Sequence, residues 1–373
     1  MGRDLVHQEV SKSAVMDKEE KIQSLRQKIE AVDDEILRLL NHRAQIVQEV
    51  GKVKSEIKMD YYSPRREEEI LQRMGAQSPG PFPRWAIPSV FREIISACRA
   101  LEAELTVAFF GPPATFSHMA CIQHFGSSIR MLPENTIQDV FEAVEREKAD
   151  YGVVPIENST EGPVSQTSDM FIKSEVKICG EIMTKISHDL LSQSGSAGDI
   201  QKIYSHPQAL GQCREWLRKH FPHVQLEEAG STAKAAQLAI EDPKAAAIAS
   251  SLAAHLYGLK AVASQIEDNL NNYTRFLVLG RQGAEKTGRD KTSILFSISH
   301  APGTLFRVLQ IFYEKGINLT KIESRPTKGK PWEYVFFIDF EGHTTDFHIA
   351  EALDKVKEHV FFVKLLGSYP RSS

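Results

Sequence analysis

An apolar side chain recurs every three or four residues from Glu19 to about Ile57. This long periodic stretch constrains the fold more than any other feature of the sequence. No proline interrupts the stretch, and its only glycine is Gly51. The pattern predicts one continuous α-helix, roughly 60 Å long at 1.5 Å per residue. Because such a helix exceeds the width of a small domain, we expect its far half to pack against a second chain.

Two shorter helices are expected next. Ser63 is a candidate N-cap for a helix that has Pro64 at its first position. The sequence SPGPFP predicts a loop, and the amphipathic residues 89–105 after it predict a third helix. We therefore expect a flexible tail over residues 1–18, followed by an all-helical domain over residues 19–104.

The period changes at Thr106. Short apolar segments, TVAFFG, DYGVVPI, KIYSH, AAAIAS and RFLVLG, alternate with amphipathic helical patterns. This order predicts an α/β domain with a largely parallel sheet over residues 105–283. A polar linker, residues 281–291, follows the last of these strands.

Beyond the linker, strands and helices follow one another in the order βαββαβ. The expected elements are residues 292–299, 303–315, 318–327, 333–341, 346–360 and 361–369. That order predicts a ferredoxin-like α+β sandwich over residues 291–370. The chain of 373 residues is thus expected to be multidomain, with an all-α, an α/β and an α+β part.

The composition excludes several classes of partner and site. The net charge is −4, which gives no reason to expect nucleic acid or an anionic membrane as a partner. The four cysteines lie far apart and form no CxxC pair, so we expect neither a disulfide framework nor a metal site. The first residues lack the apolar core of a signal peptide, and no apolar run is long enough to span a bilayer. We expect a cytoplasmic protein.

Four junctions between a predicted strand and the following helix carry polar side chains. They are Thr115 with Ser117, the turn from Ile156 to Pro163, Ser205 with Gln208 at capping-box spacing, and Ser231 with Thr232. Any one of them is best explained as an ordinary helix cap. Together they favour a site for a small polyanion, because helix N-termini at the carboxyl ends of parallel strands bind anions.

Other kinds of site have little support. Both glycine-rich phosphate motifs are absent, so a nucleotide is not expected. The motif GxSxG is also absent, which argues against a Ser-His-Asp hydrolase. His118, His188 and His206 are each either an acid of the site or a structural histidine.

The sequence TRF, residues 274–276, stands at the start of a predicted buried strand. Thr274 and Arg275 must find polar partners there, because an unpaired polar group or charge is costly to bury. The partner is either a carboxylate of the protein or a polar ligand, and the residues alone leave both open.

Three segments closely resemble the prephenate dehydratase family: GVVPIENSTEGPVSQT, YSHPQALGQC and NYTRFLVLG. The resemblance implies a two-lobed α/β fold like that of periplasmic binding proteins. It also implies a reaction that turns prephenate into phenylpyruvate with loss of water and carbon dioxide, without a cofactor. Prephenate carries two carboxylates, which suits a site for a polyanion.

The same resemblance implies roles for individual residues. Thr274 would donate a hydrogen bond to the departing hydroxyl, and Arg275 would be either a carboxylate clamp or part of a buried ion pair. Glu157 would either fix its loop or act as a general acid with a raised pKa. The cleft would be lined by Asn158, Ser159, Thr160, Ser205, Gln212, Ser231, Thr232 and Phe276.

The helical segment resembles the all-helical chorismate mutases, which rearrange chorismate to prephenate. This reaction is pericyclic, so it requires a firm grip on a folded dianion rather than a nucleophile or a metal. Arg43 and Lys54 lie eleven residues apart on nearly the same helix face, and Arg26 lies about a quarter turn away. In the family, the arginine equivalent to Arg26 reaches the site from the partner subunit. Arg66 and Glu67 also match the family pattern, and a solvated helix surface is the alternative for these cations.

Three positions depart from the mutase pattern. Ser63 stands where many mutases have Asp, and Cys98 stands where some have Ser. Glu102 stands where many have a Gln that donates to the breaking ether oxygen, and a carboxyl group donates there only when it is protonated. We still expect these residues at the mutase site, with Glu102 in a catalytic role.

The C-terminal segment resembles ACT regulatory domains through APGTLFRVL and ESRP. In such domains these two stretches meet across a dimer interface and bind L-phenylalanine. The expected effector-binding residues are Gly303, Thr304, Leu305, Glu323, Ser324, Arg325 and Pro326. Thr304 replaces the usual alanine, and a domain that only dimerises is the alternative.

Taken together, the resemblances imply a bifunctional chorismate mutase and prephenate dehydratase that is inhibited by phenylalanine and forms a homodimer or a larger homo-oligomer. Two alternatives remain open: a dehydratase with a decayed mutase domain, and a non-catalytic ligand sensor. Thr274 and the intact sequence ENST argue against the sensor.

Overall fold

The computed structural model describes residues 2–57, 62–299, 301–326 and 334–372, with side chains from Lys18 onward. The chain forms two compact units. The first consists of Met1–Tyr61 with Ala97–Ala103, and the second of Tyr62–Ser96 with Glu104–Ser373. Within the described part of the chain, none of the helices is both long enough and apolar enough to cross a membrane.

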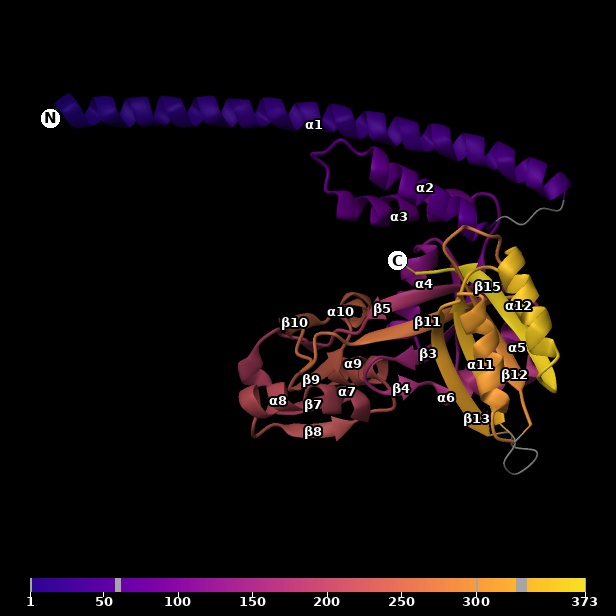
Figure 1. Ribbon diagram of the computed structural model, residues 1–373. Helices are drawn as coiled ribbons and strands as arrows, with labels where there is room; N and C mark the ends of the chain where they lie inside the picture. Colours follow the sequence, from indigo (N-terminus) through magenta and orange to yellow (C-terminus); the bar gives the residue numbers. More distant parts are fainter. Residues whose placement is uncertain (1, 58–61, 300, 327–333, 373) are drawn as a thin grey trace. The chain divides into compact units, whose positions relative to one another are not determined.

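The first unit contains α1 (Gly2–Glu56), which Figure 1 shows as a single rod. The continuous helix predicted from the apolar period is confirmed, although it begins at Gly2 rather than near Glu19. Residues 2–18 are therefore its first turns, and the flexibility expected of them stays a prediction. Apolar side chains along α1, among them Ile22, Leu25 and Ile29, are exposed. They form the surface that the expected second chain would cover.

The second unit begins with α2 (Pro64–Gln77), whose start matches the prediction. The Ser63 hydroxyl accepts a hydrogen bond from the Arg66 backbone N–H, and proline occupies the start of the helix. A 3-10 turn, η1 (Arg84–Ala86), leads into α3 (Ile87–Ala100), which corresponds to the third predicted helix. The end of α3 belongs to the first unit.

An α/β region of two lobes follows, and each lobe has its own sheet. Lobe 1 has the strand order β2-β1-β3-β11-β5, with β4 paired to β3, and lobe 2 has the order β10-β6-β9-β7-β8. The strands are β1 (Thr106–Phe110), β2 (Arg130–Glu134), β3 (Tyr151–Asn158), β4 (Gly162–Pro163), β5 (Lys177–Lys185), β6 (Asp189–Ser192), β7 (Lys202–Ser205), β8 (Gln225–Glu228), β9 (Ala245–Ala249), β10 (Lys260–Ala263) and β11 (Tyr273–Gly280). The helices are α4 (Phe116–Phe125), α5 (Ile137–Glu145), α6 (Ser165–Lys173), η2 (Ala197–Asp199), α7 (Pro207–Gln212), α8 (Arg214–His220), α9 (Thr232–Glu241) and α10 (Ser251–Tyr257).

The two-lobed fold is confirmed, but the expectation of one largely parallel sheet is wrong. In lobe 1, β1 runs parallel to β2 and β3, whereas β11 lies antiparallel between β3 and β5. In lobe 2, β9 runs parallel to β7 and antiparallel to β6. The cause is the path of the chain. Strand β5 leads into lobe 2 and β11 returns from it, so the returning strand enters the first sheet in the opposite direction.

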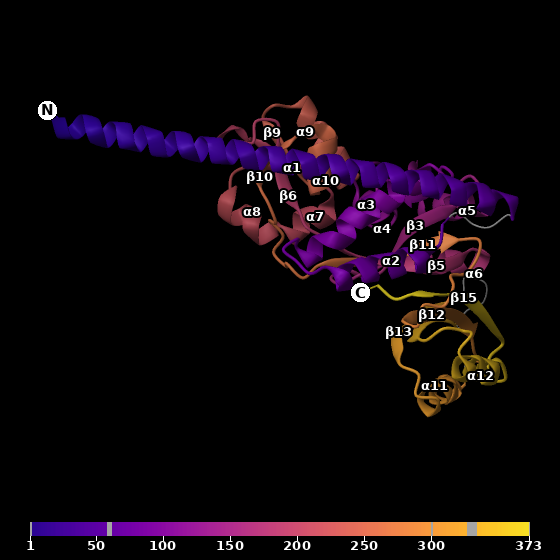
Figure 2. The ribbon, with the colours of Figure 1, turned by 90° about the horizontal axis from the view of Figure 1, so that it is seen from above.

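The C-terminal sandwich has the predicted βαββαβ order. Its elements are β12 (Asp290–Ser297), α11 (Thr304–Glu314), β13 (Leu319–Pro326), β14 (Tyr334–Glu341), α12 (Phe347–Lys357) and β15 (Phe362–Pro370). The antiparallel sheet has the order β13-β14-β12-β15, and Figure 2 shows both helices on the same face of it. The ferredoxin-like fold is thereby confirmed. Residues 327 and 333, expected at strand ends, lie outside the described residues.

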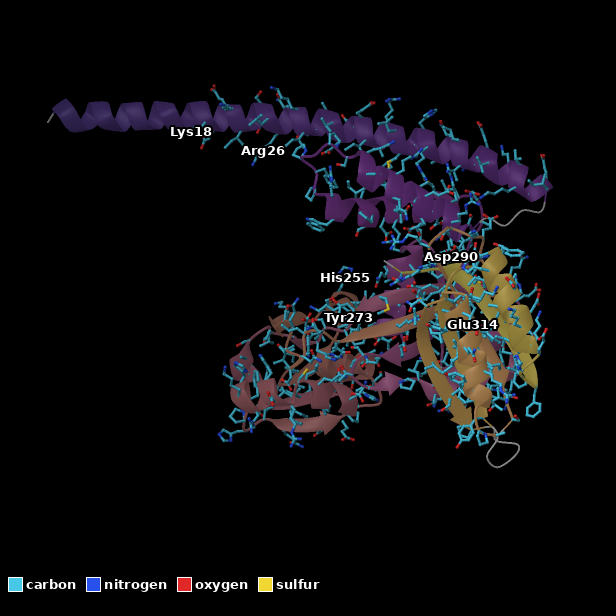
Figure 3. All side chains as sticks on the ribbon, in the orientation of Figure 1. Lys18, Arg26, His255, Tyr273, Asp290 and Glu314 are labelled. Carbon is cyan, nitrogen blue, oxygen red and sulfur yellow. The ribbon has the colours of Figure 1, made fainter. Side chains whose placement is uncertain are left out.

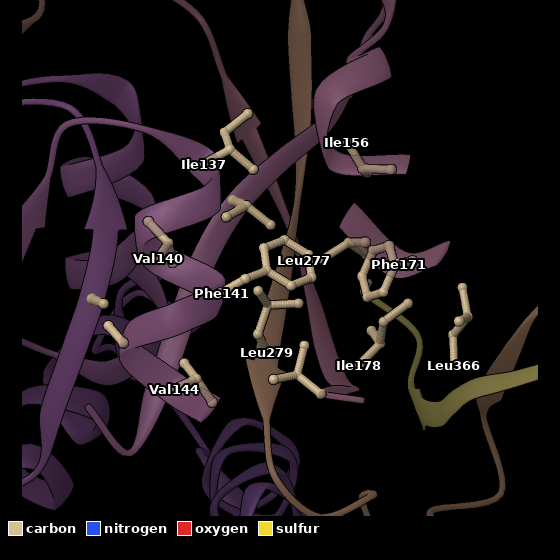
Figure 4. Close-up of a cluster of buried hydrophobic side chains, with 14 of the residues drawn as sticks. Ile137, Val140, Phe141, Val144, Ile156, Phe171, Ile178, Leu277, Leu279 and Leu366 are labelled. Carbon is tan, nitrogen blue, oxygen red and sulfur yellow. The ribbon is translucent and has the colours of Figure 1, made fainter. Parts of the chain in front are cut away.

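The sandwich and lobe 1 share a hydrophobic core, part of which Figure 4 shows. Leu277 of β11 and Phe141 of α5 belong to the same buried cluster as Leu366 of β15. The backbones of β15 and β5 also approach closely at Gly367. A Cβ at this position would lie only 2.2 Å from the carbonyl oxygen of Ile178, so only glycine fits there. The sandwich is therefore packed against the sheet that contains β11.

Candidate active site

A cavity of about 730 Å³ lies between the two lobes. Lobe 1 contributes the end of β3, the following turn and the start of α6, and lobe 2 contributes α7. The lining residues are Asn158, Thr160, Glu161, Gly162, Pro163, Val164, His206, Pro207, Gln208, Gly211, Gln212, Asp268, Asn269 and Asn272. The volume suits a small organic molecule, since such sites are typically clefts of about 300–1,000 Å³.

Asn158, the last residue of β3, has a fixed orientation at this cavity. Its Oδ1 atom accepts hydrogen bonds from the backbone N–H groups of Thr160, at 2.9 Å, and Glu161, at 3.0 Å. Such a turn leaves only the amide nitrogen of Asn158 to face the neighbouring strand. That nitrogen donates to Oδ1 of Asn272, at 2.9 Å, and to Oγ1 of Thr274, at 2.8 Å.

Thr274 lies buried near the start of β11, paired with Asn158 on one side and Thr184 on the other. The residue before it, Tyr273, is the first residue of β11 and is labelled in Figure 3. Because the Thr274 oxygen accepts from Asn158, the hydroxyl proton remains to be donated to another acceptor. Thr274 does not itself line the cavity, but it is hydrogen-bonded to Asn158, which does, and its role as a donor to the substrate stays a prediction.

Arg275 points to the opposite side of the strand, as alternation along a β-strand requires. It is buried, and its guanidinium donates to Glu181 at 2.8 Å, to Asp339 at 2.6 Å and to the Tyr369 hydroxyl at 3.0 Å. Of the two roles left open by the sequence, the buried ion pair is the one that the structure has. Arg275 does not line this cavity but a second, smaller pocket with Glu157 and Lys321, so the carboxylate clamp has no support at the cavity and stays a prediction.

Glu157 follows the same alternation and faces away from the cavity. Its carboxylate pairs with Arg275 at 3.1 Å and with Lys321 of the sandwich at 2.9 Å. Burial acts to raise the pKa of Glu157, but the ion pairs with Lys321 and Arg275 outweigh it and hold the pKa below its ordinary value. The expectation of a general acid with a raised pKa is therefore wrong. The alternative, that Glu157 fixes its loop, agrees with these contacts.

Five other residues expected in the cleft do not line this cavity. They are Ser159, Ser205, Ser231, Thr232 and Phe276. The Ser159 hydroxyl accepts from the backbone N–H of Tyr273 at 2.9 Å, so it ties the loop to β11. Phe276 is in the hydrophobic core of lobe 1 because β11 is covered on both faces.

The expectation that Ser205 caps a helix is wrong. Ser205 is fully buried at the end of β7, and its hydroxyl donates to the carbonyl of Ile248 at 2.7 Å. The N-cap of α7 is His206, whose Nδ1 atom accepts from the backbone N–H of Gln208. By contrast, the predicted caps at Thr115 and Ser231 are confirmed.

The sequence interpretation missed Asn272, which connects Asn158 to lobe 2. Its amide nitrogen donates to Oε1 of Gln212, at 3.2 Å, and Gln212 also reaches Glu161, at 3.4 Å. Asn272 is almost fully buried. Its signal in the sequence is the mostly polar run DNLNN, which ends one residue before TRF and in which a buried amide requires a partner.

In the first unit, Lys54 and Glu102 form an ion pair at 3.1 Å. Gly51 has a packing role there, because a Cβ at this position would lie 3.1 Å from Cγ of Glu102. The glycine in the long helix thus allows the Glu102 side chain to lie against α1. Cys98 is buried, and Arg26, labelled in Figure 3, is exposed on α1.

The other residues expected at the mutase site are divided between the units. Arg43 belongs to the first unit. This residue is not without an interaction partner. Ser63, Arg66 and Glu67 belong to the second unit, where Ser63 caps α2 and Arg66 pairs with Glu69 at 3.3 Å.

The residues expected to bind an effector lie at two places in the sandwich. Gly303, with φ of +81°, precedes α11, and the Thr304 hydroxyl donates to the carbonyls of Ser299 and Ala301, both at 2.9 Å. Leu305 packs against the sandwich core.

On β13, two of the expected effector residues face α6 of lobe 1. Arg325 donates to Asp169 at 2.9 Å and to the Ser165 hydroxyl at 2.6 Å. Glu323 accepts from the Ser168 hydroxyl at 3.4 Å. Ser324 and Pro326 are exposed.

Three family models match successive parts of the chain. Chorismate mutase type II matches residues 25–103, prephenate dehydratase matches residues 107–284, and the ACT domain matches residues 292–358.

Known proteins match the chain over most of its length. A bifunctional chorismate mutase/prephenate dehydratase from Aquifex aeolicus is 48% identical over 95% of this chain and 99% of its own length. A crystal structure of prephenate dehydratase from Arthrobacter aurescens in complex with L-Phe has a TM-score of 0.67 at 37% identity, covering 72% of this chain and 90% of that one. A prephenate dehydratase structure from Staphylococcus aureus has a TM-score of 0.63 at 30% identity, covering 71% of this chain and 100% of that one. The family expected from the motifs is confirmed, and the chain belongs to the bifunctional chorismate mutase/prephenate dehydratases.

Proposed function

We propose that the helical part of this chain rearranges chorismate to prephenate and that the cavity between the lobes converts prephenate to phenylpyruvate. The observation that carries the second step is the hydrogen bond of 2.8 Å from Asn158 to Thr274. Asn158 is itself fixed by two backbone N–H groups, so it presents the threonine oxygen with a donor and directs the threonine proton elsewhere. A dehydration requires such a positioned proton donor.

In the proposed dehydration, the Thr274 hydroxyl donates a hydrogen bond to the hydroxyl of prephenate that departs. As the C–O bond breaks, that hydroxyl takes up one proton, relayed from solvent through Thr274, and leaves as water. The electrons of the bond between the ring and its carboxylate move into the ring, and the carboxylate leaves as carbon dioxide. Because the ring becomes aromatic, the enzyme needs mainly to position the leaving group and stabilise its developing charge.

The substrate of this step is a dianion, yet the described residues that line the cavity include neither arginine nor lysine. Neutral donors therefore hold the substrate in this proposal. Thr160, Gln208 and Gln212 offer hydroxyl and amide groups at the cavity. Among the described residues that line it, His206 is the only one whose side chain can become a cation. Arg275 contributes by keeping β11 in place rather than by touching substrate.

For the mutase step, the pericyclic reaction requires cations around the breaking ether oxygen and the carboxylates. Lys54 is the best-placed candidate, since its ammonium lies 3.1 Å from the carboxylate of the largely buried Glu102 side chain, and Lys54 itself is 21% exposed. Arg43 and, from the partner subunit of a homodimer, Arg26 are proposed to complete the site. The exposed apolar side chains of α1 support such a dimer.

Adding chorismate to the pure protein and following both products tests the proposal. We expect prephenate to appear first and phenylpyruvate to accumulate from it. If the mutase domain has decayed, chorismate will persist while added prephenate is still consumed. If the protein is only a ligand sensor, neither compound will change.

We propose that L-phenylalanine binds the sandwich and inhibits the dehydratase more strongly than the mutase. The contacts of β13 support this direction. Arg325 and Glu323, two expected effector residues, bond to α6, and α6 begins directly after Val164 at the cavity wall. A ligand that binds either side chain would compete with its contact to α6. The ligand would thereby favour an arrangement without this contact over the one described here.

Ser324→Ala should weaken phenylalanine inhibition without changing uninhibited turnover, because Ser324 is exposed and does not line the cavity. The loss of one neutral hydrogen bond predicts about 1 kcal/mol, or roughly fivefold weaker binding. Calorimetry with L-phenylalanine and inhibition assays measure this, with Ser194→Ala in lobe 2 as the control. An absence of both binding heat and inhibition at millimolar phenylalanine would leave the sandwich with a dimerisation role alone.

A further inference from the structure

We infer that His188 is a positioning residue of the dehydratase site, whose ring N–H fixes the side-chain amide of Gln212 so that its NH₂ group faces the cavity. This inference rests on the proposed dehydratase function. His188 lies where the chain passes from β5 to β6, and so from lobe 1 to lobe 2. It is 2% exposed, and its Nε2 atom lies 2.9 Å from Oε1 of Gln212.

The orientation of the Gln212 amide follows from a chain of hydrogen bonds that begins at the backbone. Two backbone N–H groups fix Oδ1 of Asn158, so its NH₂ group donates to Oδ1 of Asn272. Asn272 must then present its own NH₂ group to Gln212, and the atom that it meets there, at 3.2 Å, is Oε1. The Gln212 oxygen is therefore an acceptor, and its nitrogen points toward Glu161 at the cavity wall.

This orientation determines which ring nitrogen of His188 carries the proton. An acceptor at Oε1 requires an N–H at Nε2, and a neutral imidazole has only one N–H. Burial lowers the pKa of His188 below its ordinary value, against the opposing effects of Gln212, Glu267 and Asp189, which favours the neutral ring. Among the described residues, Nδ1 of His188 has no hydrogen-bond partner, as suits an unprotonated nitrogen better than a buried N–H.

Other contacts hold the backbone and the ring of His188 in place. Glu267 accepts from the backbone N–H of His188 at 2.9 Å and from the Ser187 hydroxyl at 3.0 Å. The ring of Phe116 meets His188 edge to face, with centroids 5.4 Å apart. His188 thus serves as a rigid donor behind Gln212. If this donor were lost, the amide could turn over and present its oxygen to a substrate carboxylate.

Two variants separate this donor from the packing of the ring. His188→Phe keeps an aromatic ring beside Phe116 and removes the N–H, whereas His188→Gln loses the ring and keeps an N–H near the position of Nε2. We expect His188→Phe to lower dehydratase kcat/KM roughly five- to tenfold, which is the usual effect of losing one hydrogen bond. Most of this loss should be a higher KM for prephenate. His188→Gln should retain most of the activity. The opposite ranking would mean that His188 only fills space, and would overturn the inference.

Further measurements keep the result interpretable. Mutase turnover and the melting temperature of each variant report whether the protein is folded. In a Gln212→Ala background, His188→Phe should have no additional effect on KM, and an undiminished additional effect would overturn the inference. Nitrogen NMR of the wild type, with the His188 signals assigned by their loss in His188→Gln, should find Nε2 protonated and Nδ1 bare. The reverse tautomer would also overturn it.

A failure of the proposed function is distinguishable from a failure of this inference. If wild-type protein does not consume prephenate, or if Gln212→Ala leaves prephenate turnover unchanged, the proposed site is wrong. If Gln212→Ala impairs turnover but His188→Phe does not, the site stands and His188 has no positioning role.

Discussion

Replacing Thr274 by alanine should lower dehydratase turnover roughly a hundred- to a thousandfold and leave mutase turnover unchanged. Removing one hydrogen-bond donor that acts in a transition state typically costs about 2.7–4 kcal/mol, which corresponds to this range. In the structure, the Thr274 oxygen accepts from Asn158 at 2.8 Å. In the proposed mechanism, the Thr274 proton is then donated to the departing hydroxyl. Production of phenylpyruvate from added prephenate, and of prephenate from chorismate, measures the two activities separately.

Two variants serve as controls for this result. Thr274→Ser keeps the hydroxyl and should retain most of the dehydratase activity. Thr184 is a buried threonine opposite Thr274 on β5, and its hydroxyl bonds to Gln123 instead of a cavity residue. Thr184→Ala therefore tests the effect of removing a hydroxyl from the same ladder, and we expect near-normal turnover. Near-normal phenylpyruvate formation by Thr274→Ala would remove Thr274 from the mechanism.

The periodic elements of this chain could be predicted from the sequence because each has a local cause. The long α1 follows from an unbroken apolar period, the start of α2 from Ser63 and Pro64, and the sandwich from its βαββαβ order. These features depend on residues close together in the chain. The direction of β11 could not be predicted in this way, since it depends on where lobe 2 returns the chain.

The same distinction explains which of the predicted site residues the structure brings together. Asn158 and Thr274 stand in segments typical of the family, and antiparallel pairing of β3 with β11 brings them together. Ser205 has the spacing of a capping box, yet β7 extends through it, and burial gives its hydroxyl the Ile248 carbonyl instead. A rule based on local spacing cannot predict this hydrogen bond, because the carbonyl that accepts it lies on another strand.

Arg275 shows a further limit of the sequence. A buried arginine beside a catalytic residue is equally compatible with a substrate clamp and with an internal ion pair. Its partners Glu181, Asp339 and Tyr369 come from a different strand of lobe 1 and from the sandwich. Only the docking of the sandwich on lobe 1 decides between the two roles, and no local pattern encodes that docking.

The position of Arg275 has a consequence for regulation. One face of β11 directs Thr274 to the cavity side, and the next residue bonds to β14 and β15 of the sandwich. Lys321 and Lys291 extend the network, because they pair with Glu157 and Glu181, each at 2.9 Å. A change in the sandwich can thus act on the strand that carries the proposed catalytic hydroxyl. This arrangement supports an effector response that acts mainly on the dehydratase.

Arg275→Met should destabilise the second unit by about 3–5 kcal/mol, the usual cost of removing one partner from a buried ion pair. Glu157 and Glu181 keep lysine partners in this variant. Among the described residues, the fully buried Asp339 carboxylate keeps only the hydroxyl of Ser293. Urea denaturation measures the loss. As a matched control, Arg65 pairs with Glu69 at the surface, with both side chains about half exposed, so Arg65→Met should cost less than about 1 kcal/mol.

A double variant identifies the source of this cost. If the unpaired Asp339 carboxylate is responsible, Arg275→Met combined with Asp339→Asn should be more stable than Arg275→Met alone, because the second change removes the uncompensated charge. The double variant should still lack the link between β11 and the sandwich, so phenylalanine should bind it and yet inhibit prephenate turnover less than in the wild type. Equal stabilities of the single and double variants would place the cost in lost packing of the arginine side chain. Unchanged inhibition in the double variant would mean that the effector acts through β13 and α6 rather than through Arg275.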